Sequence, residues 1–136
     1  MSNNNNPVHG GGVRIYICTA CDYGNVAHIE CKTTGQHLFD QVVAVCGLQA
    51  DVEVVPVECL AVCDRPVTVA YQAPKKWSYV LGGVDPTRDA DDVLAAAKAI
   101  ANSVSGIPSM SERPSFFLSG VISRLPPTNF SLPSND

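Results

Sequence analysis

Apolar residues along the chain fall into four short runs that are typical of β-strands. The first, residues 13–18, alternates apolar and mixed side chains and is rich in β-branched types, which favour an extended backbone. The second, residues 51–58, is almost continuously apolar, although Pro56 cannot donate a hydrogen bond inside a sheet and marks an edge there. The third and fourth, residues 67–71 and 77–81, are separated by a short turn and predict an antiparallel hairpin.

Two further segments show the apolar spacing of three to four residues that is typical of helices. The first begins near Gly35 and ends at Gly47, and its apolar residues form two adjoining stripes. These stripes are Leu38, Val42, Val45 and Phe39, Val43, Cys46. The second helix is predicted to begin at Asp85-Pro86, because aspartate favours the cap position and proline favours the first turn. Its buried stripe is predicted to be Val93, Ala97, Ile100 and Val104.

The predicted order of elements is β-α-β-β-β-α, which is the order found in the thioredoxin-like α/β fold. The first helix connects residues 13–18 to residues 51–58 as a crossover, so these two strands are expected to be parallel neighbours. The hairpin then adds two antiparallel strands. The result is a mixed four-stranded sheet with two helices.

The composition of the chain divides it into three parts. Residues 1–12 are rich in asparagine and glycine, and we expect them to form a disordered leader. Residues 13–104 contain the predicted strands and helices and form the domain. Residues 105–136 are proline-rich, and we expect an extended arm that packs partly on the domain, with a short helical turn near residues 115–122.

Overall composition and charge narrow the class of protein. The 136 residues are 46% hydrophobic and 16% charged, which is not the composition of a disordered chain. The formal net charge of −4 argues against a nucleic-acid-binding protein, which carries a basic surface. No apolar run reaches the roughly 18–20 residues that span a bilayer, and the N-terminal residues do not resemble a secretory signal. We therefore expect a cytoplasmic protein without a membrane partner. Lys75 and Lys76, in the hairpin turn, are expected to be solvated charges.

Six cysteines are the main chemical feature of the sequence. In a small cytosolic protein they favour metal ligation or redox chemistry over structural disulfides. Cys18 closes the first predicted strand and Cys59 closes the second, and parallel neighbours end at the same edge of a sheet. Cys63 follows in the same loop as Cys59, and Cys31 belongs to the long loop before the first helix. These four thiols are therefore expected to converge, and Cys21 is a fifth candidate in the long loop.

The spacing of these cysteines leaves two kinds of metal centre open. Four thiolates suit either zinc or an iron–sulfur cluster. Zinc sites favour two tight knuckles, which Cys18-x2-Cys21 and Cys59-x3-Cys63 would supply. If Cys31 is used instead of Cys21, the twelve residues between Cys18 and Cys31 favour a two-iron cluster, whose ligands are spread more widely.

The cysteine pattern over residues 13–83 resembles that of the thioredoxin-like [2Fe-2S] ferredoxins. The resemblance is carried by Ile17-Cys18-Thr19-Ala20-Cys21, then Cys31, then Cys59-x3-Cys63 ahead of a β-hairpin. Ligands in the small ferredoxins of this group follow the pattern Cys-x12-Cys and Cys-x3-Cys. The resemblance therefore implies a [2Fe-2S] cluster held by Cys18, Cys31, Cys59 and Cys63, with Cys21 as a spare thiol.

The rest of the chain resembles a family of small bacterial metal-binding proteins of the same fold. The segments that carry this resemblance are Val57-Glu58-Cys59-Leu60, Lys76-Trp77-Ser78-Tyr79-Val80-Leu81-Gly82-Gly83-Val84-Asp85-Pro86, Gly106-Ile107-Pro108, Glu112-Arg113-Pro114 and Arg124-Leu125-Pro126-Pro127. Members of that family often show only Cys-x2-Cys and Cys-x3-Cys, which implies Cys21 in place of Cys31 as the fourth ligand. Their genes often accompany cobalt or cobalamin functions, which implies metal handling as an alternative role.

These features predict a one-electron carrier or sensor and not an enzyme. No nucleophile–base pair and no phosphate-binding glycine loop stands in the sequence. A zinc-binding or metal-handling protein is the first alternative. The second is a thiol–disulfide oxidoreductase that uses Cys18 and Cys21, although a turn sequence follows Cys21 where that chemistry needs a helix N-terminus. The expected partner is a redox protein, and a homodimer is a further option.

Overall fold

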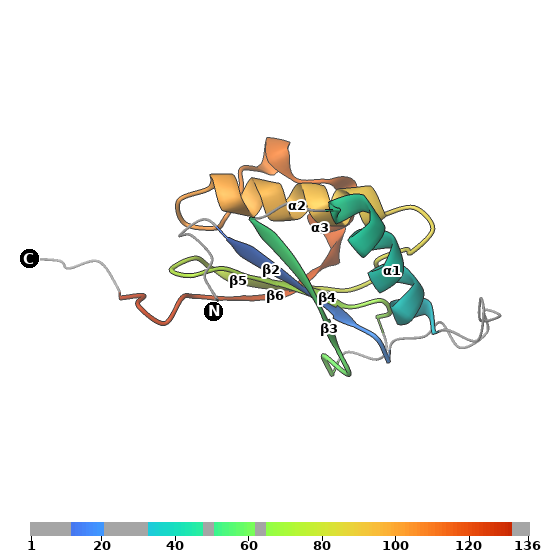
Figure 1. Ribbon diagram of the computed structural model, residues 1–136. Coiled ribbons are helices and arrows are strands. Elements are labelled where there is room, and N and C mark those ends of the chain that lie inside the picture. The colour runs from blue at the N-terminus through green and yellow to red at the C-terminus, as the bar shows by residue number, and fades with distance from the viewer. Residues whose placement is uncertain (1–11, 21–32, 48–50, 62–64, 132–136) are drawn as a thin grey trace, which may run out of the picture.

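A single mixed sheet forms the centre of the chain, and three helices lie together on one side of it (Figure 1). The computed structural model describes residues 12–20, 33–47, 51–61 and 65–131. The elements in chain order are β2 (Val13–Cys18), α1 (Thr34–Cys46), β3 (Val52–Val57), β4 (Val69–Gln72), β5 (Ser78–Leu81), α2 (Ala90–Asn102), the 3₁₀ helix η1 (Met110–Glu112), α3 (Ser115–Gly120) and β6 (Val121–Leu125). The strand order in the sheet is β3-β2-β4-β5-β6.

Strand pairing confirms the predicted crossover and the predicted hairpin. β2 pairs in parallel with β3, in a register that runs from Val13 opposite Val52 to Cys18 opposite Val57. On its other side β2 pairs antiparallel with β4, and β4 pairs antiparallel with β5. β2 is therefore an inner strand, and α1 connects it to its parallel neighbour, as a parallel pair requires.

The core lies between the sheet and the helices. Alternate residues of β2, namely Val13, Ile15 and Ile17, are buried on the helix side, and Leu38 and Val42 of α1 are buried with them. The hydroxyl group of the buried Tyr71 in β4 donates a hydrogen bond to the carbonyl oxygen of Val93 in α2, at 2.8 Å. The bond gives the buried hydroxyl group of Tyr71 a partner, while the ring of Tyr71 packs in the core.

Among the described residues the sheet has five strands, so the prediction of four strands is wrong. The fifth, β6, pairs antiparallel with β5 and contains an irregularity opposite Val80 and Leu81. It follows α3 directly, and α3 is held by Phe117, whose ring centroid lies 4.8 Å from that of Tyr79 and 6.2 Å from that of Tyr71. β6 itself has no buried residue. A strand at a sheet edge with so little burial lacks the apolar alternation by which strands are predicted.

The second helix begins later than predicted, at Ala90. The side chain of Asp85 accepts hydrogen bonds from the backbone N–H and the hydroxyl group of Thr87, and the side chain of Asp89 accepts one from the backbone N–H of Asp85. These bonds hold residues 85–89 in a turn, which is the local alternative that aspartate offers to a helix. The helix ends at Asn102, so Val104 is 95% exposed and does not extend the buried stripe as predicted.

Lys76 is buried, contrary to the prediction that it is a solvated charge. Its Nζ atom donates to the carbonyl oxygens of Ile100, Ala101 and Ser103, at 3.1, 2.8 and 2.6 Å. Burial lowers the pKa of Lys76 below the ordinary lysine value. The last carbonyl groups of a helix have no partner within the helix, and a cation at this end also suits the helix dipole. Lys76 therefore anchors the C-terminal end of α2 to the hairpin turn.

Lys76→Met is expected to lower the free energy of unfolding by about 2 kcal/mol, because it removes three hydrogen bonds from a charged donor to the end of α2. Chemical denaturation of wild type and variant measures this difference. Lys75→Met is the matched control, since Lys75 is the exposed lysine of the same turn, and its change is expected to stay within about 0.5 kcal/mol. Equal losses in both variants would contradict this role of Lys76.

Candidate metal centre

Cys18 and Cys59 both stand where the parallel strands β2 and β3 end. Cys18 is the last residue of β2 and lies opposite Val57, the last residue of β3, and Cys59 follows two residues later. Past the strand ends the pairing continues: Thr19 N–H donates to the carbonyl oxygen of Val57 at 2.8 Å, and Ala20 N–H donates to that of Glu58 at 3.1 Å. The predicted convergence of these two strand ends at one sheet edge is therefore confirmed.

The two sulfur atoms have different surroundings. Cys18 is 2% exposed, and its Sγ lies 3.8 Å from the carbonyl oxygen of Glu58, so its thiol is directed toward the chain that follows β3. Cys59 is exposed, and its Sγ accepts a hydrogen bond from the backbone N–H of Ala61 at 3.2 Å. Ala61 itself has a φ angle of 67°, in the left-handed region that residues with a side chain seldom adopt. Backbone N–H groups on sulfur stabilise the thiolate form and tune metal clusters.

Helix α1 begins directly beside Cys18. Thr33 caps the helix in a reciprocal pair with Gln36, and its hydroxyl group also donates to the carbonyl oxygen of Thr19. Gly35, in the first turn, is so close to the backbone of Cys18 that a Cβ atom there would overlap the Cys18 carbonyl oxygen. The positive end of the dipole of α1 is therefore adjacent to the strand end, and it favours negative charge there.

The described residues contain only part of the predicted ligand set. Cys21, Cys31 and Cys63 lie outside the described ranges, and the predictions made for them remain untested. Within the described ranges, no three histidine, cysteine, aspartate or glutamate residues come together as a metal site. Cys46 is buried in the core, with its Sγ 3.9 Å from the carbonyl oxygen of Val52, as expected for a residue of the apolar stripe.

Four residues near these strand ends were given no role at the site from the sequence. The capping pair Thr33 and Gln36 has a sequence signal, a threonine followed three residues later by glutamine, ahead of an apolar run. Gly35 has no comparable signal, because its close approach to Cys18 depends on how α1 docks. The N–H···S bond from Ala61 likewise depends on the conformation of the loop after β3.

The strand order, the parallel pair and the helices on one face define a mixed α/β fold similar to that of thioredoxin-like ferredoxins. A thioredoxin-like [2Fe-2S] ferredoxin from Aquifex aeolicus matches with a TM-score of 0.53 and 16% identity, over 88% of this chain and 98% of the ferredoxin. A second structure, of the wild-type thioredoxin-like [2Fe-2S] ferredoxin from Aquifex aeolicus, gives a TM-score of 0.51 and 15% identity, over 82% and 97%. At this identity the likeness establishes the fold alone.

The chain belongs to the family described as "Protein of unknown function (DUF1636)", whose model matches residues 15–127. No curated protein matches the chain. The resemblance to small bacterial metal-binding proteins linked to cobalt or cobalamin stays a prediction. Within the described part of the chain, no helix is long and apolar enough to cross a membrane.

Proposed function

We propose that the protein carries single electrons by means of a [2Fe-2S] cluster held by the thiolates of Cys18, Cys31, Cys59 and Cys63, and that it is not an enzyme. The observation that supports this most directly is that Cys18 ends β2 beside the end of its parallel neighbour β3, two residues before Cys59, in a fold similar to that of thioredoxin-like [2Fe-2S] ferredoxins. Bound there, such a cluster would take up and release one electron.

Connectivity supports the remaining ligands of the proposal. Each cysteine outside the described ranges is at most two positions along the chain from a described residue near the ends of β2 and β3. Cys21 follows Ala20, Cys31 precedes Thr33 by two positions, and Cys63 follows Ala61 by two. Since consecutive Cα atoms are 3.8 Å apart, all three can reach the neighbourhood of Cys18 and Cys59.

The chain's own groups suit a negatively charged centre. The N–H of Ala61 donates to the sulfur of Cys59, and the N-terminal end of α1 lies beside Cys18. Both place positive partial charge next to thiolates, and their effect is larger for a centre that gains negative charge on reduction. The exposure of Cys59 leaves one side of the edge open to a redox protein partner.

Metal and sulfide analysis of protein purified without oxygen tests the proposal. About two iron and two acid-labile sulfide per chain are expected, with a red-brown colour and a paramagnetic signal after reduction by one electron. Colourless protein with one zinc per chain would replace the proposal with the zinc-binding alternative. Colourless, metal-free protein that reduces disulfides would replace it with the oxidoreductase alternative.

The fourth ligand is tested by single alanine variants. Cys31→Ala is expected to lower iron content and visible absorbance more than Cys21→Ala does. Cys31 precedes the helix whose first turn is fixed against the Cys18 backbone, and this anchors the chain near the strand end. Loss of colour in Cys21→Ala with full colour in Cys31→Ala would reverse the assignment. Full colour in both single variants and in the double variant would rule out both residues.

A further inference from the structure

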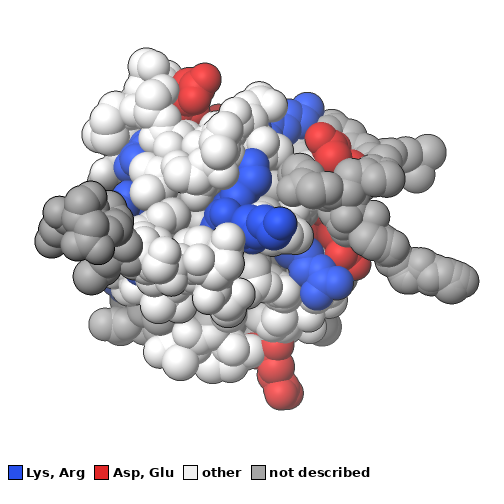
Figure 2. All heavy atoms as spheres, turned by 90° about the vertical axis from the view of Figure 1, so that its left-hand side faces the viewer, with Lys and Arg blue, Asp and Glu red and all other residues white. Residues whose placement is uncertain are grey.

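The described sheet has two edge strands, β3 on one side and β6 on the other. An edge strand turns half of its backbone N–H and C=O groups away from the sheet, and a strand of another molecule can pair with them. Like charges on two copies of the chain are a weak barrier to such pairing here, because the formal net charge is only −4. Figure 2, which views the end of the molecule with the β4–β5 turn, shows a largely uncharged surface between a few charged side chains. What an incoming strand meets therefore depends on the residues of the two edges.

Hydrogen bonds at both ends of the parallel pair show which residues of β3 face β2. The carbonyl oxygen of Asp51 accepts from the N–H of Val13 at 3.0 Å, and that of Val57 accepts from the N–H of Thr19 at 2.8 Å. Backbone groups point to alternate sides along a strand, so the odd-numbered residues of this stretch face β2 and the even-numbered residues face away. The backbone groups on the free edge of β3 therefore belong to Val52, Val54 and Pro56.

Pro56 interrupts the hydrogen-bonding groups on this edge. Proline has no N–H, so the exposed Pro56 offers an incoming strand a carbonyl oxygen only. The outward series does not resume at the next even-numbered residue, because the carbonyl oxygen of Glu58 accepts from the N–H of Ala20 at 3.1 Å. Among its described residues, the free edge of β3 therefore presents two backbone N–H groups, those of Val52 and Val54, before the proline.

A hydrogen bond at the start of β6 gives the same information for the opposite edge of the sheet. The N–H of Gly82 donates to the carbonyl oxygen of Gly120 at 2.9 Å, so the backbone of Gly82 faces β6. Since alternate residues of a strand face the same neighbour, Val80 and Ser78 of β5 also face β6. The residues of β6 that face β5 are their partners in the register, Ser123 and Leu125.

Ile122 and Arg124 thus present the outward N–H groups of β6, and Pro126 stands at the next outward position. Pro126 is exposed and again has no N–H to offer. At its other end the outward run begins at α3, whose last residue directly precedes β6. Both edges of the described sheet therefore present two outward N–H groups followed by a proline.

We infer that Pro56 and Pro126 close the two edges of the sheet to strand addition, so that copies of this chain do not join edge to edge. At each proline an incoming strand loses a hydrogen bond, and the ring obstructs the carbonyl oxygen that would approach. The metal centre is not involved, since only backbone groups of the two edges take part. Contact with a partner protein is then left to the faces of the sheet and to its ends, one of which carries Cys18 and Cys59.

Sedimentation velocity of Pro56→Val and Pro126→Val over a range of protein concentrations tests this inference. Each variant opens one edge and is expected to dimerise at least about 10-fold more tightly than wild type, because a two-fold pair regains two hydrogen bonds. The double variant is expected to form larger assemblies, since each copy then has two open edges. Sedimentation identical to that of wild type in either single variant would overturn the inference for that edge.

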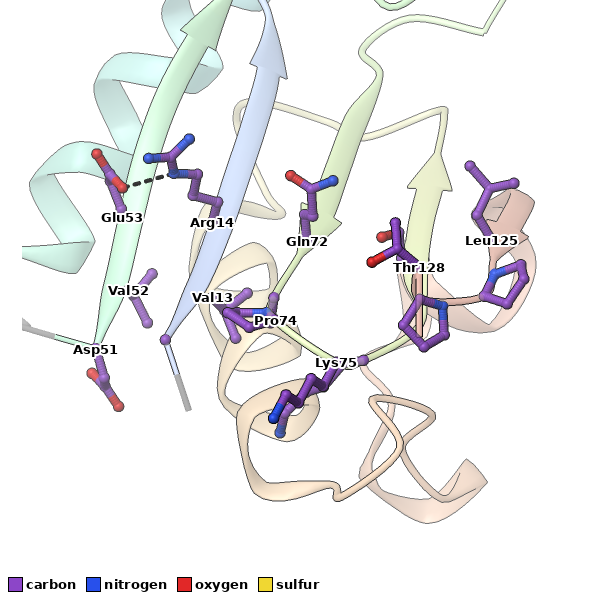
Figure 3. Close-up of a pocket in the computed structure, with 16 residues that line it drawn as sticks. Val13, Arg14, Asp51, Val52, Glu53, Gln72, Pro74, Lys75, Leu125 and Thr128 are labelled. Carbon is purple, nitrogen blue, oxygen red and sulfur yellow. Dashed lines mark hydrogen bonds and ion pairs between the residues drawn. The ribbon is translucent and has the colours of Figure 1, made fainter. Parts of the chain in front are cut away.

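Pro74→Val is the matched control for these variants. Pro74 is an exposed proline of the β4–β5 turn and lines the same pocket of about 530 Å³ as Pro126, but it belongs to neither edge strand (Figure 3). The control is therefore expected to sediment like wild type. Association of Pro74→Val as tight as that of Pro126→Val would overturn the inference.

Amide hydrogen exchange locates the contact between copies. In wild type the N–H of Val54 is expected to exchange rapidly and that of Val55, which faces β2, to exchange slowly. In the Pro56→Val dimer the exchange of Val54 is expected to slow by at least about 10-fold, because its N–H then pairs with the second copy. Slow exchange of Val54 in wild type, or unchanged exchange in the dimer, would overturn the inference.

Discussion

Cys59→Ala protein is expected to purify with at least about 10-fold less iron than wild type and without its visible absorbance, and Cys18→Ala is expected to do the same. Both residues lie at the shared edge of β2 and β3, and each is proposed to supply one of four thiolates. Cys59 is exposed, so its removal leaves the core intact and the loss of iron reports on ligation. Iron, sulfide and absorbance per folded chain are the measurements.

Cys46→Ala is the matched control for these variants. Cys46 is a thiol of the same chain, but it is buried between α1 and β3 and takes no part in the proposed site. Its removal is expected to cost some stability, as a small cavity does, and to leave iron and sulfide at wild-type levels. Iron lost in Cys46→Ala but kept in Cys59→Ala would show that the cluster is held elsewhere.

Gly35→Ala is expected to lower the free energy of unfolding by about 3 kcal/mol, the upper end of the range for overpacking. A Cβ atom at this position would overlap the carbonyl oxygen of Cys18 and lie 3.1 Å from both the Cys18 carbonyl carbon and the Thr19 Cα. These are backbone atoms of a paired strand end, so relief requires α1 or the end of β2 to move. The cluster content is expected to fall as well, because the strand end carries Cys18.

The sign of the change in the free energy of unfolding distinguishes a steric clash at position 35 from the ordinary helix propensity of alanine. In an uncrowded helix, glycine to alanine is stabilising by up to about 1 kcal/mol. Gln41 is an exposed residue of the same helix, so the difference in stability between Gln41→Gly and Gln41→Ala supplies that reference. Chemical denaturation of the pairs gives the comparison. A stabilising effect of alanine at position 35 would show that α1 does not approach Cys18 as closely as described.

The elements predicted best are those whose signal is local. The alternation in residues 13–18 gives the bounds of β2, and the apolar stripe with its closing Gly47 gives those of α1 to within a residue at either end. The parallel pairing of β2 and β3 then follows from a general rule about crossovers. That rule is also why the meeting of Cys18 with the end of β3 was predictable without any knowledge of the side-chain packing.

The features that escaped prediction depend on contacts distant in sequence. Lys76 is buried because the end of α2 closes over the hairpin turn, about 25 residues later in the chain. β6 is a strand because Phe117 docks on Tyr79 and brings the following residues alongside β5. Gly35 is required because α1 packs on the end of β2. In each case the residue itself is unremarkable, and its partner determines its role.

One of the two thiols stands at the end of β2 and the other just after the end of β3, and this has a consequence for the order of events during folding. Cys18 and the residue that its sulfur contacts, Glu58, are 40 positions apart in sequence. The unfolded chain must close this long loop, and form the crossover through α1, before the thiols share an edge. A peptide that ends before β3 therefore lacks half of this edge. Under the proposed function, cluster assembly is expected to follow the pairing of β2 with β3, in contrast to small zinc modules in which the ion itself drives folding.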